Sequence, residues 1–157
     1  MGILESDVRH RRRRRNAGLK TPANAITIYN LRQTRTALAA AAAARRPVTV
    51  LSAPVASAAA GPAWFAAVIE QAGAAYPDAE FTAMLDCGTL PGCALAALRH
   101  GLKAIRYDGP QWRKIQDIAA QSGATVVRKR PRSLDLMTLP ENDDAVLDAC
   151  RKWLSNK

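Results

Sequence analysis

The sequence predicts an α/β fold, a three-layer, mainly parallel sheet of about five strands with flanking helices, doubly wound in the flavodoxin-like or Rossmann-like manner. Two observations favour this class. Short β-prone runs alternate with stretches of helical periodicity, and the runs begin at regular intervals, near residues 25, 48, 81, 103 and 124. Such alternation is typical of parallel sheets covered by helices. A half-barrel that dimerises is the alternative, because five units are too few to close an eight-stranded barrel.

The first predicted unit, residues 25–46, combines a strand, a helix start and a helix end. Residues 25–29 are rich in β-branched and aromatic side chains, which favour a strand. Asn30 and Gln33 have the spacing of a capping box that opens a helix. The helix then runs through the alanine tract and ends before Pro47, which cannot continue it. By the same criteria, the later strands are predicted at 48–51, 81–85, 102–107 and 124–127, and the later helices at 62–76, 93–100, 111–121 and 143–154.

Length and composition predict one α/β domain, residues 24–157, behind an arginine-rich arm, residues 1–23. The chain has 157 residues and 48% hydrophobic residues, enough for one core. Much of that fraction is alanine, which buries little area, so we expect modest stability or a homodimer. Half of the net charge of +10 lies in the first 20 residues, which contain seven basic and two acidic side chains.

The arm carries a strong charge signal with little specificity. It contains five consecutive arginines, which repel one another and disfavour compact structure: Arg11, Arg12, Arg13, Arg14 and Arg15. Such a run would bind the phosphates of nucleic acid, without sequence preference, or an acidic protein. A solvated tail without a partner is the alternative reading.

Cysteine content and hydropathy indicate a cytoplasmic protein. Cys87, Cys93 and Cys150 suit a reducing compartment better than a disulfide framework. Their spacing, with no histidine close by, is not that of a zinc site, and the sequence identifies no cofactor. No stretch approaches the ~20 apolar residues of a membrane helix, so we expect no membrane span.

The candidate ligand site lies at the carboxyl ends of the predicted strands, where parallel α/β folds bind ligands. The turn from Asp86 to Gly92 is its most informative part, because backbone N–H groups and a helix dipole there could hold a phosphate or carboxylate. The turn matches neither a P-loop nor a dinucleotide fingerprint. Alternatively, its glycines only permit the turn while Asp86 or Thr89 caps the helix. The candidate ligand-binding residues are Ser52, Asp86, Gly88, Thr89, Gly92, Asp108 and Arg130.

Three of the strand-end residues are candidates for catalysis. Cys87 could be a nucleophile stabilised by a helix N-terminus, although His100 lies at the far end of that helix. Asp86 and Asp108 could form a carboxylate pair or bind a divalent cation. Helix capping and turn stabilisation explain both aspartates more simply.

Three functional hypotheses follow from these observations. The leading one is a non-catalytic module that binds a small anionic ligand or a protein partner at the carboxyl edge of its sheet. The second is a small enzyme of acyl or phosphate chemistry that uses Asp86, Cys87 and Asp108. The third is a nucleic-acid-associated protein that acts through the arginine arm.

Overall fold

The computed structural model describes residues 24–54 and 60–156. Within them it confirms the α/β class, with one parallel sheet and flanking helices. In chain order the elements are β1 (Ala25–Ile28), α2 (Leu31–Ala44), β2 (Val48–Ser52), α4 (Gly61–Ala75), β3 (Phe81–Asp86), α5 (Pro91–Arg99), β4 (Ala104–Arg106), α6 (Trp112–Gln121), β5 (Thr125–Val127), β6 (Ser133–Asp135), a 3₁₀ turn (Leu136–Thr138) and α7 (Asp143–Ser155).

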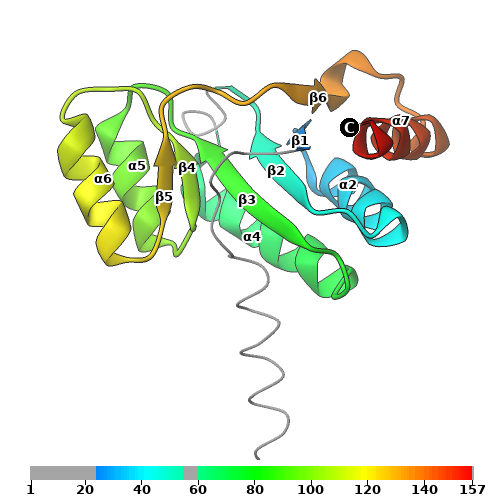
Figure 1. The fold of residues 1–157 in the computed structure, drawn as a ribbon, viewed down its shortest axis with the longest axis horizontal. Helices are drawn as coiled ribbons and strands as arrows, with labels where there is room; N and C mark the ends of the chain where they lie inside the picture. Colours follow the sequence, from blue (N-terminus) through cyan, green and yellow to red (C-terminus); the bar gives the residue numbers. More distant parts are fainter. Residues whose placement is uncertain (1–23, 55–59, 157) are drawn as a thin grey trace, which may run out of the picture.

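The strand order is β5-β4-β3-β2-β1-β6, and every neighbouring pair is parallel. β1 to β5 therefore lie side by side in chain order, and β6 returns to pair with the free side of β1 (Figure 1). The register places Ile28 beside Ser52 and Asp86 beside Arg106. Because all strands are parallel, their carboxyl ends share one edge of the sheet.

The helices share one core with one face of the sheet. This core contains Ile26 and Val50 from the strands, and buried side chains from each of the five described helices, among them Phe65 of α4 and Ile115 of α6. The helices adjoin one another in the series α7-α2-α4-α5-α6. Right-handed crossovers that step in one direction along a sheet place their helices on the same face, which explains this arrangement.

A second, smaller apolar cluster lies on the other face of the sheet. It consists of Ala25, Leu51, Met84 and Ala104, which alternate along the strands with residues of the main core. The parallel sheet with flanking helices confirms the α/β arrangement that the sequence predicts.

Helix α2 lies between α4 and α7 in the helical layer and shows how alanine contributes to the core. Ala37, Ala40 and Ala41 are almost completely buried, with α4 on one side of the helix and α7 on the other. Small side chains let neighbouring backbones approach closely, so close contact compensates for the small area that each alanine buries.

The capping box at the start of α2 is confirmed. The Gln33 backbone N–H donates to Asn30 Oδ1 at 2.8 Å, and the Tyr29 backbone N–H donates to Gln33 Oε1 at 2.8 Å. This reciprocal pair satisfies two backbone donors next to the end of β1. It fixes the point at which the chain leaves the carboxyl edge of the sheet.

The sixth strand, β6, was not predicted. Its three residues, Ser133–Asp135, follow a basic segment that contains Pro131 and give too short a pattern for a period-2 alternation. The strand forms because β1 offers a free edge, to which Ser133–Asp135 pairs with Ser133 beside Ala25. Within the described residues, no helix combines the length and apolar character needed to cross a membrane.

Candidate functional site

Asp86, the last residue of β3, is the centre of the candidate site. Its side chain is 2% exposed and both of its oxygens have partners. Arg106 Nη1 lies 3.3 Å from Oδ1, and Arg130 Nη1 lies 2.5 Å from Oδ2. The Gly88 backbone N–H also donates to Oδ1, at 2.9 Å. A carboxylate removed from water requires such partners, since desolvation of an ion costs several kcal/mol.

Arg130 joins the ends of three strands through one guanidinium group. Besides Asp86 on β3, its Nη2 donates to Thr27 Oγ1 of β1 at 3.0 Å and to the Ser52 carbonyl of β2 at 3.1 Å. Ser52 contributes further, because its Oγ accepts the Asp86 backbone N–H at 2.8 Å. The planar fork of an arginine suits several simultaneous acceptors, which a lysine could not match in one position. The β5–β6 connection is thus fixed across the sheet edge (Figure 1).

Further arginines lie along the same edge of the sheet. Arg106 Nε donates to the Arg128 carbonyl at 2.9 Å, which ties β4 to the start of the β5–β6 connection. The Arg128 side chain pairs with Asp108 at 2.9 Å and stacks over the Trp112 ring at 5.1 Å from its centroid. This second pair is exposed, with 59% and 43% of the two side chains accessible. Farther along, Arg132 stacks over Trp153.

The structure brings together Ser52, Asp86, Gly88 and Arg130 of the predicted ligand-binding set. Asp108 lies nearby in a separate pair with Arg128. Within the described residues, no hydrogen bond joins the side chain of Thr89, or any atom of Gly92, to the Asp86 cluster. Gly88 has a left-handed φ of +55°, so a residue with a side chain would be strained there.

The alternative that Asp86 or Thr89 caps the following helix is wrong. Helix α5 begins at Pro91, its N-cap residue is Leu90, and no side chain caps it. The Asp86 carboxylate instead accepts the Gly88 N–H inside the turn and pairs with arginines. Arg106 and Thr27 complete the site and were missed, although Arg106 is the last residue but one of the strand predicted at 102–107 and lies close to the predicted strand end.

The catalytic candidates have surroundings that favour unreactive states. Cys87 is buried in the main core, and its hydrogen bond with Cys93, then burial, then the nearby charges of Cys93 and Asp86, raise the pKa of the Cys87 thiol well above its usual range. A protonated thiol is a poor nucleophile. Asp86 and Asp108 each pair with arginine rather than with one another. In the described part of the chain, no group of three or more His, Cys, Asp or Glu side chains could hold a metal ion.

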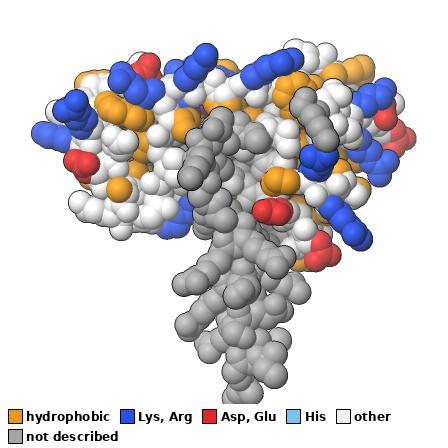
Figure 2. Space-filling view, viewed as in Figure 1, with side chains coloured by type: hydrophobic (Ala, Val, Ile, Leu, Met, Phe, Trp, Pro, Cys, Tyr) orange, Lys and Arg blue, Asp and Glu red, His pale blue; other side chains and the backbone are white. Residues whose placement is uncertain are grey.

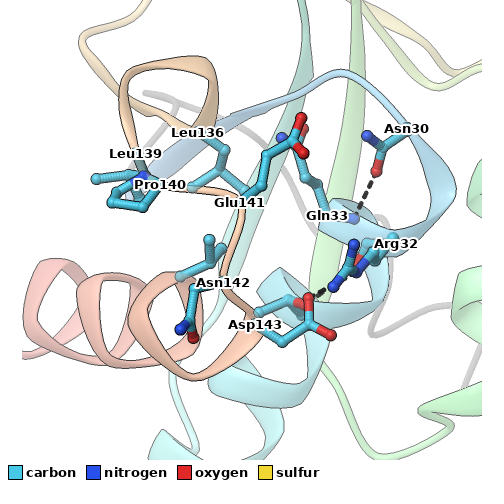
Figure 3. Close-up of a pocket in the computed structure, with 11 residues that line it drawn as sticks. Asn30, Arg32, Gln33, Leu136, Leu139, Pro140, Glu141, Asn142 and Asp143 are labelled. Carbon is cyan, nitrogen blue, oxygen red and sulfur yellow. Dashed lines mark hydrogen bonds and ion pairs between the residues drawn. The ribbon is translucent and has the colours of Figure 1, made fainter.

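A cleft lies elsewhere, between the first turns of α2 and α7 (Figure 3). It holds a volume of about 120 Å³, and Asn30 and Asn142 line it as the N-caps of the two helices. Asn142 Oδ1 accepts backbone N–H groups of its own helix, and Arg32 Nε pairs with Asp143 at 2.7 Å. The polar groups of this cleft therefore serve helix capping and an interhelical ion pair.

Comparisons with known proteins add no relative: no protein-family model matches the chain, and no curated protein matches it significantly. The geometry alone therefore defines the class of protein, a parallel α/β domain whose carboxyl edge carries an arginine cluster on a buried aspartate. The predicted anion-binding arginines 11–15 lie outside the described residues.

Proposed function

We propose that the protein binds a small ligand with a phosphate or carboxylate group at the carboxyl edge of its sheet, through Arg106 and Arg130. One observation carries this proposal. Two guanidinium groups converge on the single carboxylate of Asp86, and each keeps about a quarter of its side chain exposed. One negative charge neutralises only one of the two, so a positive charge remains at the edge.

The free donors of these arginines support the proposal. Within the described residues, Arg106 Nη2 and Arg130 Nε make no hydrogen bond, although the other nitrogens of both groups do. Guanidinium N–H groups bind carboxylate and phosphate oxygens with short, charge-assisted bonds. A ligand oxyanion would therefore find donors that the described residues leave unused.

The surrounding charge also favours an anion. The β5–β6 connection contains four basic residues among five, from Arg128 to Arg132, and Arg106 adds a fifth cation. Only Asp86 and Asp108 pair with them among the described residues. Figure 2 shows lysine and arginine side chains along the same rim of the molecule. Such a field raises the local concentration of anions.

The rigidity of the cluster favours binding over a purely structural role. Arg130 is held by Asp86, Thr27 and Ser52, so little side-chain entropy remains to be lost when a ligand binds. The alternative enzyme of acyl or phosphate chemistry has less support, because the Cys87 thiol is buried and protonated and both aspartates are paired.

The test is ligand-induced stabilisation of the full chain by inorganic phosphate, pyrophosphate and citrate. A ligand at ~100 times its Kd stabilises a fold by about 2.7 kcal/mol, which is visible as a rise in Tm. We expect Arg130→Gln and Arg106→Gln to reduce this ligand-induced rise. Arg32→Gln is the matched control, since Arg32 is an exposed, paired arginine outside the cluster.

Two results would contradict the proposal. One is a panel in which none of the three anions raises Tm, and the other is an equal loss of the ligand effect in Arg32→Gln. A full-length variant with all arginines 11–15 changed to glutamine separates the arm from the edge site. That variant also tests the nucleic-acid hypothesis, which stays a prediction together with a cytoplasmic location and a homodimer.

A further inference from the structure

Two cysteines lie together where β3 leads into α5. Cys87 is the first residue after β3 and is buried, whereas Cys93 lies in the first turn of α5 and is half-buried. Cys87 belongs to the main core and Cys93 packs against that core, and their side chains are hydrogen-bonded to one another. Cys87 Sγ also lies 3.8 Å from the Leu85 carbonyl oxygen. The two thiol groups therefore lie within hydrogen-bonding reach of one another, at the two ends of one short turn.

We propose that Cys87 and Cys93 are a redox-active thiol pair, which closes to an intramolecular disulfide when a small disulfide oxidant reaches Cys93. This inference concerns a covalent site and does not depend on anion binding at Arg106 and Arg130. The third cysteine, Cys150, is buried on α7, and the pair does not include it.

The intervening loop is suited to closure. The Leu90 N–H donates to the Cys87 carbonyl at 3.0 Å, so the chain turns back toward the first turn of α5. A disulfide brings two sulfur atoms to about 2 Å and needs side chains that already face one another. Gly88 and Gly92, both in this connection, have open space where a Cβ would lie. Among the described residues, no neighbouring side chain therefore packs against the Cβ side of either glycine in this turn.

Exposure assigns a different role to each cysteine. Cys93 is the more accessible of the two, and it lies at the positive end of the α5 dipole, where an anion is favoured. Cys93 is therefore the attacking residue. Cys87 is buried and holds its proton more firmly, which suits the residue that reacts second.

With oxidised glutathione the reaction has two steps. The Cys93 thiol releases its proton to solvent, and its sulfur attacks the glutathione disulfide, so that a Cys93–glutathione bond forms and one glutathione thiolate leaves. Because the Cys93 thiol has been consumed, the hydrogen bond that most raises the pKa of Cys87 is removed. The Cys87 thiol then loses its proton to solvent, and its sulfur attacks Cys93 Sγ and expels the second glutathione thiolate. Two cysteine thiols are oxidised, and one glutathione disulfide is reduced to two thiols.

The experiment treats the full, folded chain with oxidised glutathione and measures intact mass and tryptic peptides. We expect the loss of two hydrogens, located in peptide 46–99, which contains Cys87 and Cys93 but not Cys150. Free thiols should fall from three to one, and dithiothreitol should restore them. Cys150→Ser is the matched control and should still lose two hydrogens.

The two single variants distinguish a pair from independent thiols. Cys87→Ser should stop at the first step and keep one glutathione on Cys93. Cys93→Ser should acquire neither a disulfide nor a glutathione at Cys87. A wild-type chain that keeps both thiols, or that retains glutathione on Cys93 without closure, would overturn the inference, and neither result requires a variant to fold.

Discussion

Asp86 ends β3, Asp108 follows the neighbouring strand β4, and each pairs with arginine, yet their environments are opposite. Asp86 is 2% exposed and contacts two guanidinium groups, whereas Asp108 is 43% exposed and pairs with Arg128 alone. Water and salt screen the exposed pair, so such pairs contribute about 0–1 kcal/mol. In the buried pair each partner depends on the other, because the loss of one leaves an unpaired charge.

The comparison shows that a position at a strand end does not by itself determine the burial or the pairing of an aspartate in this fold. Asp86 is covered because the β5–β6 connection crosses the edge above β1, β2 and β3 and places Arg130 on it. Asp108 lies one strand farther out, where that connection begins. The difference therefore depends on a crossing between distant strands and not on the local sequence around either aspartate.

The largest effect is expected for Asp86→Ala. We expect a loss of about 3 kcal/mol in the free energy of unfolding, at the lower end of the range for broken buried pairs. The value is low in that range because about a quarter of each of the Arg106 and Arg130 side chains is exposed, so water can solvate both guanidinium groups once the carboxylate is removed. Urea denaturation followed by circular dichroism measures it.

Asp86→Asn is the matched control for this prediction. Asparagine keeps an oxygen that can accept the Gly88 N–H but removes the charge that both arginines face. We expect an intermediate loss of stability. If Asp86→Ala and Asp108→Ala proved equally destabilising, the contrast between a buried and an exposed pair would be refuted.

Gly109→Ala tests whether the exposed strand end is constrained by its backbone rather than by charge. A Cβ at position 109 would lie 2.6 Å from the Thr89 carbonyl oxygen and 2.7 Å from Tyr107 Oη. Overpacking of this kind costs about 1–3 kcal/mol. The same denaturation assay measures the effect. We expect substitution of the neighbouring Asp108 to cost less stability.

Gly92→Ala provides the matched glycine control. Position 92 lies in the first turn of α5, has open space around a Cβ and does not need a positive φ. Alanine there should leave stability unchanged or raise it by about 0.5–1 kcal/mol, because glycine is a poor helix former. Equal losses in the two variants would show that the close approach at Gly109 is not the cause.

Asn30→Ala tests an uncharged hydrogen bond, for comparison with the two ion pairs. It removes the acceptor for the Gln33 N–H at the start of α2, and we expect a loss of about 1 kcal/mol. Asn30→Asp should keep most of the stability, since a carboxylate can accept the same bond and suits a helix N-terminus. A thermal unfolding series measures both, and an equal loss in Asn30→Asp would argue against the cap.

Local patterns were sufficient for the repeating units and for this cap. The five predicted strands are present, and Asn30 and Gln33 act as their spacing indicated. Patterns along the chain could not reveal β6, because its pairing depends on the free edge of β1, far away in sequence. The same applies to the Arg130–Asp86 contact, which joins residues 44 positions apart. Strand-end positions were predictable, but their partners were not.

Asp108→Asn is expected to have the smallest effect and completes the comparison. Asparagine removes the charge that faces Arg128, but that guanidinium is 59% exposed and still stacks on Trp112. The expected loss is below about 1 kcal/mol, within the range for exposed pairs. The salt dependence of stability should also distinguish the two aspartates, because an exposed pair is screened at 1 M ionic strength, where the Debye length is about 3 Å.

The measurement is a urea series at low and high salt for wild type, Asp86→Asn and Asp108→Asn. The small difference between wild type and Asp108→Asn should vanish at high salt, whereas the difference between wild type and Asp86→Asn should persist. A salt-independent loss in Asp108→Asn would mean that Asp108 acts through its backbone turn rather than through Arg128. In that case only the buried aspartate, Asp86, would stabilise the fold through its pairs with arginine.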